Sequence, residues 1–255
     1  MRKVLTNLLY KDLLDSWRNY KVLIIVITFL FFGLISPLSA YFMPQLLNMI
    51  GSDQGVLIEI NTPTQMDSYL QFHKNISQIA LLIMIFLFMG NVSNEKESGS
   101  VDFLLVKPIK SSFYIISKFI SLLILAFFAM LISTITCGFY TFFLFKTLVI
   151  SDLLRMSFYL YFYIITILSI TILFSSLVKK QFVAGIFTFL TWIIIQSLSS
   201  FSFLRTFLPT RVLNEAHLAA VGMSSNIYSI INSIIMILIC LIIAIYGFKK
   251  QRDSL

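Results

Sequence analysis

Residues 94–118 read NEKESGSVDFLLVKPIKSSFYIISK and form a long polar segment between two strongly apolar runs. If a helix begins near Gly99, its apolar residues fall on one face, as in an amphipathic helix. These residues are Val101, Leu104, Leu105 and Pro108. Pro108 lacks a backbone N–H and should end or kink the helix. The acidic start and basic end suit docking into a groove of another protein. A loop helix resting on lipid head groups would show the same spacing.

The composition around this segment indicates a chain that lives in a bilayer. Of its 255 residues, 58% are hydrophobic and only 12% are charged, and the mean hydropathy is +0.93. Soluble domains carry about 25% charged residues, so no soluble core could hide this apolar surplus. We therefore predict an all-α integral membrane protein. Its net charge of +8 is expected in basic loops rather than at a nucleic-acid site.

Six apolar runs are long enough to cross about 30 Å of hydrocarbon. They divide a single transmembrane domain, residues 1–255, into spans at 22–43, 76–92, 119–145, 153–178, 182–200 and 226–248. Residues 1–21 contain Asp12 and Asp15 and predict an interfacial helix rather than a cleaved signal peptide. Cys137 and Cys240 lie within apolar runs, so we predict neither a disulfide framework nor a metal site.

The basic residues fall unevenly on the two sides of this layout. The N-terminal segment holds five Lys and Arg residues, the loop at 94–118 four, the turn at 179–181 two and the tail three, whereas the alternate loops together hold five. Because basic loops stay on the cytoplasmic side, we expect both termini and the 94–118 loop in the cytoplasm of a multi-pass cell-membrane protein.

Residues 94–118 also resemble part of a known family. The pattern E-x-E-x-G-[ST]-x-[DE]-x-L-L-x-x-P-[IV], followed by Lys118, is similar to the first cytoplasmic loop of ABC-2-type permeases, with Ser100 where Thr is commoner. This resemblance implies a coupling helix between spans 2 and 3 that rests on an ABC ATPase (nucleotide-binding) subunit. The residues expected to couple to the ATPase are Glu95, Glu97, Gly99, Val101, Leu104, Leu105 and Pro108.

Residues 201–225 are too apolar for a free outer loop, and Pro209 divides them into two short helical pieces. ABC-2 permeases carry short re-entrant helices between their last two spans, and this segment is similar in place and character. An interfacial loop helix is the alternative. His217 has no nearby ligand residues in the sequence and is expected at the surface.

The sequence contains no G-x-x-x-x-G-K-[ST] loop to cradle ATP phosphates. We therefore expect a non-catalytic permease without a cofactor of its own, and ATP and magnesium on a partner ATPase chain. No ionisable residue falls in the middle of a predicted span, which weighs against ion-coupled transport.

Mild polar residues mark the second and fifth spans. These are Asn91, on the same side as Met84, in the second, and Thr188, Gln196 and Ser199, near the face of Trp192, in the fifth. Hydrogen bonding between helices explains such residues without any pathway. The family resemblance implies the other interpretation, in which both spans line a translocation path where the chain meets a second permease copy or a paralogue.

A path without buried charges favours a cargo with apolar surface and charges at its ends. We therefore predict an exporter of amphipathic peptides, such as toxins or antimicrobial peptides. Export of hydrophobic drugs or sodium is one alternative. A membrane scaffold or assembly factor without transport activity is another.

Overall fold

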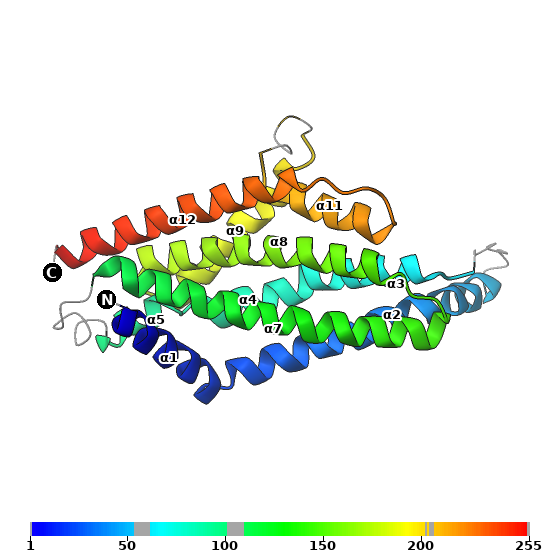
Figure 1. The fold of residues 1–255 in the computed structure, drawn as a ribbon, viewed down its shortest axis with the longest axis horizontal. Helices are drawn as coiled ribbons and strands as arrows, with labels where there is room; N and C mark the ends of the chain where they lie inside the picture. The colour runs from blue at the N-terminus through cyan, green and yellow to red at the C-terminus, as the bar shows by residue number, and fades with distance from the viewer. Residues whose placement is uncertain (1, 54–61, 101–109, 202, 204–206, 254–255) are drawn as a thin grey trace.

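The computed structural model describes residues 2–53, 62–100, 110–201, 203 and 207–253, and every regular element within these ranges is helical. The helices run roughly along one long axis, and both termini lie at the same end of the bundle (Figure 1). We call this end the terminal end. Six helices in the described part of the chain are long and apolar enough to cross a membrane, which confirms the predicted number.

The elements follow one another as shown in Figure 1. They are α1 (Arg2–Arg18), α2 (Lys21–Asp53), α3 (Gln65–Asn75), the π-helix η1 (Ile76–Ala80), α4 (Leu81–Phe88), α5 (Ser93–Glu97), α7 (Ser111–Phe145), α8 (Ile150–Leu177), α9 (Gln181–Leu198), α11 (Thr210–Ala220) and α12 (Tyr228–Asp253).

Several helices extend beyond the bounds predicted from hydropathy. Helix α2 continues through Pro37 and Pro44 to Asp53, where a polar connection was predicted. Each proline removes one backbone hydrogen bond, a loss that membrane helices tolerate. The second span begins at Gln65 instead of residue 76, because the polar helix α3 runs directly into η1 and α4. Helix α7 begins at Ser111 rather than residue 119.

Polar side chains stabilise the part of the second span that hydropathy missed. Ser68 on α3 is fully buried, and its hydroxyl lies 2.7 Å from that of Thr141 on α7. The hydroxyl of Tyr69 donates to the Val149 carbonyl at 3.3 Å. Because these groups are satisfied inside the bundle, a helix of low hydropathy can pack there.

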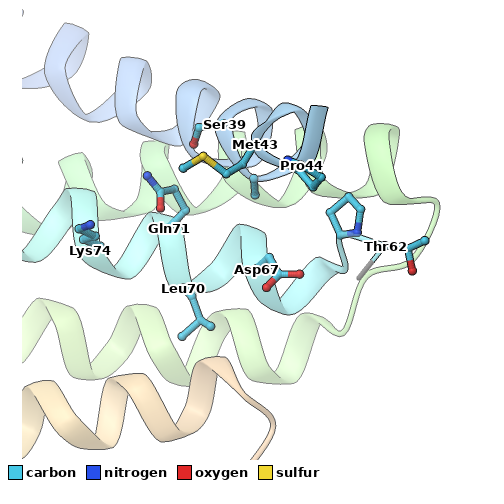
Figure 2. Close-up of a pocket in the computed structure, with 10 residues that line it drawn as sticks. Ser39, Met43, Pro44, Thr62, Asp67, Leu70, Gln71 and Lys74 are labelled. Atoms are coloured by element: carbon cyan, nitrogen blue, oxygen red, sulfur yellow. The ribbon is translucent and has the colours of Figure 1, made fainter. Parts of the chain in front are cut away.

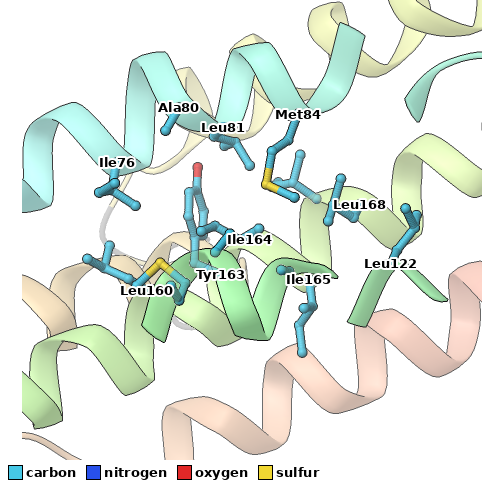
Figure 3. Packing of buried hydrophobic residues seen from close by; sticks show 14 of the residues in the cluster. Ile76, Ala80, Leu81, Met84, Leu122, Leu160, Tyr163, Ile164, Ile165 and Leu168 are labelled. Atoms are coloured by element: carbon cyan, nitrogen blue, oxygen red, sulfur yellow. The ribbon is translucent and has the colours of Figure 1, made fainter. Parts of the chain in front are cut away.

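Helix α8 is the centre of the bundle. Of its most apolar stretch 72% is buried, against 22% for α9 and 28% for α12. Helices α7, α9, α11 and α12 all pack against it. Figure 3 shows the core beside it, where Tyr163 points from α8 toward η1 and α4. Both Tyr163 and Met84 are completely buried.

Helix α11 lies within the predicted outer segment and begins directly after Pro209, which caps it. Its small residues face α8 and are fully buried, and they include Ala216, Ala219 and Ala220. Small side chains let two helices approach closely. The first helical piece was predicted before Pro209, and residues 202 and 204–206 of it lie outside the described part of the chain. Re-entry of this segment into the membrane stays a prediction.

Candidate functional site

The short helix α5 contains the first two predicted coupling residues, Glu95 and Glu97, and lies at the terminal end of the bundle (Figure 1). The backbone N–H groups of Val92 and Ser93 both donate to Ser175 Oγ on α8 at 3.0 Å. Gly99 closes the helix with a left-handed φ of 70°, a conformation that favours glycine at a helix C-terminus. The start of α5 is therefore held by a contact with α8, whereas its end is set by the local sequence.

Glu95 points from α5 into the bundle. Its Oε1 accepts hydrogen bonds from Lys118 Nζ at 2.8 Å and from Lys11 Nζ at 2.9 Å. Its Oε2 accepts a hydrogen bond from the Tyr114 hydroxyl at 2.6 Å. One carboxylate thus connects α5 to both α7 and α1.

Lys118 is the buried centre of this arrangement. Its side chain is only 3% exposed, and its Nζ also contacts Asp12 Oδ1 at 3.0 Å. Asp12 accepts a second hydrogen bond, from Ser117 Oγ at 3.1 Å. We call Lys11, Asp12, Glu95 and Lys118 the ion cluster. Its two cations and two carboxylates balance in charge, a condition for keeping such groups out of water.

The next residue, Lys96, fastens α5 to the opposite side of the bundle. Its Nζ donates to the Ser176 carbonyl of α8 and, at 2.7 Å, to Gln251 Oε1 of α12. Gln251 in turn donates to the Leu177 carbonyl at 2.6 Å. Helix α5 therefore contacts the terminal-end portions of α1, α7, α8 and α12. We call these contacts, together with the ion cluster, the α5 junction.

The structure describes only part of the predicted coupling set. Glu95 is directed inward, Glu97 is exposed, and Gly99 ends α5. Val101, Leu104, Leu105 and Pro108 lie outside the described residues.

Two members of the ion cluster were not predicted from the sequence, and a third was predicted at a different position in its helix. Lys11 and Asp12 were not identified as site residues, and Lys118 was expected only at the start of a span. Because α7 begins earlier, Lys118 lies about two turns inside the helix. The one available signal was that Leu8, Asp12 and Ser16 recur every four residues, which places them on one face of α1, and all three are buried there.

Of the residues proposed for a translocation path, two are buried, Met84 and Thr188, and four are partly exposed, Asn91, Trp192, Gln196 and Ser199. Trp192 Nε1 and Gln196 Nε2 both donate to the Tyr163 hydroxyl, at 2.9 and 2.7 Å. Thr188 bonds the Ala184 carbonyl at 2.9 Å, and Ser199 bonds the Gln196 carbonyl at 2.6 Å. The contacts of Trp192 and Gln196 are hydrogen bonds between α9 and α8, whereas those of Thr188 and Ser199 stay within α9 and its C-terminal end. A path at a dimer interface stays a prediction. The role of Tyr163 as the shared acceptor was not predicted from the sequence.

Two hollows open toward the end of the bundle opposite the termini. A cleft of about 430 Å³ lies between α2 and α3, with Met43 on one side and Asp67 and Gln71 on the other (Figure 2). A groove of about 630 Å³ lies between α3, η1, α9 and α11. Lys74 lines both hollows. Within the described residues, no three His, Cys, Asp or Glu side chains group closely enough to hold a metal ion.

Two comparisons with known proteins bear on this arrangement. Residues 6–252 match the family described as ABC-2 family transporter protein. A stretch of 119 residues is 28% identical to the "Uncharacterized transmembrane protein YxlG" of Bacillus subtilis (strain 168). That match covers 46% of each chain, so the aligned part spans about half the length of this relative.

Proposed function

The chain belongs to the ABC-2 family of transporter proteins, and from this premise we propose that it exports its cargo using ATP hydrolysed by a separate subunit. Membership of the family makes it a membrane permease subunit of an ABC transporter. We propose that segment 94–118 is the contact with the ATPase and that the α5 junction passes the movement on. The α5 junction is the single observation that carries this proposal.

The junction suits coupling because α5 is fixed to four helices at once. A displacement of the segment after Gly99 would pull on Glu95 and Lys96, which are neighbours with partners on opposite sides of the bundle. Rigid helices can carry such a displacement through the membrane. Glu97 is exposed, so it is free to meet a partner, whereas Glu95 holds α5 in place.

The orientation that we propose has both termini and α5 in the cytoplasm. In a variant without Cys137 and Cys240, Ser98→Cys should resist an impermeant thiol reagent applied to intact cells. Thr147→Cys, at the opposite end, should react. Both positions are exposed, whereas the nearby Ser68 is buried against Thr141 and would be uninformative. Labelling of Ser98→Cys from outside, without labelling of Thr147→Cys, would contradict this orientation and place α5 outside the cell.

We propose that the functional unit contains a second permease copy or a paralogue. Helix α9 is the least buried of the six candidate spans, and its exposed residues include Phe182, Ile186, Leu190 and Ile193, spaced along one face. Either lipid or a second permease can cover such a face. The family assignment favours the second permease, which would bring the second and fifth spans to the path between the subunits.

The cargo that we propose is an amphipathic peptide. The α9 residues predicted to line a path, such as Thr188 and Gln196, carry hydrogen-bonding groups but no charge, and Thr188 is fully buried in this chain. The ion cluster lies at the terminal end and is already paired, so it offers no free charge to an ion in transit. Such a path favours a molecule with a large apolar surface and charges at its ends. Hydrophobic drugs and sodium remain the alternatives.

Reconstitution with the ATPase in liposomes tests this choice. Amphipathic peptides, hydrophobic drugs and sodium should be titrated separately while ATP turnover is measured. We expect turnover to rise with amphipathic peptides and to stay unchanged with sodium alone. Stimulation by sodium without any response to peptides would overturn the peptide proposal, and no response to any of them would favour a scaffold.

A further inference from the structure

The groove between α3, η1, α9 and α11 has a polar part and an apolar part. Its polar part holds Lys74 and His217, both of which are exposed. Its apolar part includes Trp192 and Ile193 on α9. Of the described residues that line it, none is acidic, and Asp67 instead lines the neighbouring cleft of Figure 2. The groove therefore complements a ligand that has an anionic head and an apolar body.

The walls of the groove are held in place by defined contacts. His73 Nε2 donates to the Leu213 carbonyl at 3.0 Å, which joins α3 to α11. The rings of His73 and His217 meet edge to face, with centroids 5.8 Å apart. On α9, Trp192 and Gln196 are fixed by the Tyr163 hydroxyl. The groove is thus preformed, which lowers the entropy cost of binding.

The position of the groove sets the depth of its ligand in the bilayer. Helix α9 has 18 residues and is about 27 Å long, close to the thickness of the hydrocarbon layer. Its two ends therefore lie near the two membrane–water interfaces. The groove contacts its C-terminal part, where Gln196 lies within a turn of the helix end, near the head groups, and Trp192 lies about 9 Å from that end, in the hydrocarbon. Ser77 and Gln78 reach the groove from the π-helix η1, and π-helical turns are frequent at functional sites.

We propose that this groove binds an anionic phospholipid. Lys74 and His217 would contact the phosphate, Gln78 and Ser197 would donate further hydrogen bonds, and the acyl chains would lie along Trp192 and Ile193. A phosphate on an apolar body fits the cation, the donors and the apolar wall together. This inference goes beyond the proposed transport function and does not depend on it, because the permease alone should bind the lipid.

Trp192 provides a direct signal for binding. The chain has two tryptophans, so Trp17→Phe leaves Trp192 as the only one. The complete chain in neutral detergent is titrated with phosphatidylglycerol or phosphatidylcholine whose acyl chains carry bromine, which quenches tryptophan fluorescence. We expect phosphatidylglycerol to quench Trp192 at about tenfold lower concentration, as one lost charge-assisted contact implies. Equal quenching by both lipids would overturn the proposal.

Matched variants separate the groove from general surface charge. Lys74→Gln and His217→Gln should each raise the phosphatidylglycerol concentration needed for half quenching, with Lys74→Gln shifting it to about that of phosphatidylcholine. Lys146→Gln removes another exposed lysine, outside the groove, and should change nothing. If Lys74→Gln behaves like Lys146→Gln, Lys74 does not bind the lipid and the proposal is wrong.

Two competitors identify the source of the anion. Inorganic phosphate at the same concentration should not restore the fluorescence quenched by phosphatidylglycerol, because it lacks the apolar body. Full restoration would mean a site for a free anion and would contradict the lipid assignment. An amphipathic peptide with a free C-terminal carboxylate should also compete less well than unlabelled phosphatidylglycerol. Stronger competition by the peptide would assign the groove to the cargo instead.

Discussion

Lys118→Met is expected to destabilise the folded chain by about 3–5 kcal/mol, since it removes the cation from a buried ion cluster. Lys118 is 3% exposed and contacts both Asp12 and Glu95, whose side chains are 5% and 18% exposed. In the variant, Lys11 would be the only cation left in the ion cluster to balance the two carboxylates. Its side chain is already 40% exposed. Thermal unfolding of the purified chain in detergent measures this loss.

Two further variants separate loss of charge balance from loss of packing. Lys110→Gln removes an exposed lysine next to the start of the same helix and should leave the melting temperature almost unchanged. Asp12→Leu combined with Lys118→Met removes one opposite charge as well, so most of the stability should return. If Lys118→Met melts like Lys110→Gln, the ion cluster does not stabilise the terminal end of the bundle.

Leu104→Asp combined with Leu105→Asp should release the ATPase subunit while leaving insertion into the membrane intact. Each leucine contributes about 1.5–3 kcal/mol if the partner covers it fully, so losing both lowers the association constant more than about a hundredfold. The measurement is the amount of ATPase that co-purifies with the variant and its rate of ATP turnover.

A single carboxylate on the other face of the predicted helix is the control for this variant. Val106 lies on the other side of the helical wheel, about 150° from the middle of the apolar face, so Val106→Asp should retain the ATPase. If the double variant retains the ATPase with unchanged turnover, segment 94–118 is a surface loop and not the contact.

The number of membrane helices was predictable because it depends on the length of apolar runs, which can be read directly from the sequence. Their ends were harder to predict. Helix α3 has the polar sequence QMDSYLQFHKN, and it packs only because groups such as Ser68 and Tyr69 find partners on other helices. Such partners are far away in the sequence, so hydropathy placed the start of this span about three turns too late.

The candidate site was also predictable from the sequence only in part. Glu95 and Lys118 belong to a local pattern, and that pattern pointed to the correct segment of the chain. The contact between Lys118 and Asp12 was not predictable, because Asp12 lies 106 residues before Lys118. The inward direction of Glu95 also depends on α1 and α7 meeting at the terminal end. Contacts between distant segments decide which motif residues face a partner and which hold the bundle together.

One measurement bears most directly on whether this chain is a permease worked by a separate ATPase. The complete chain is purified from its native membrane in mild detergent, and the co-purified proteins and their ATP hydrolysis are analysed. We expect a P-loop ATPase to be present, its turnover to rise with amphipathic peptide, and both to be lost with Leu104→Asp and Leu105→Asp. Recovery of the folded wild-type chain without any P-loop ATPase and without ATP hydrolysis would contradict this function.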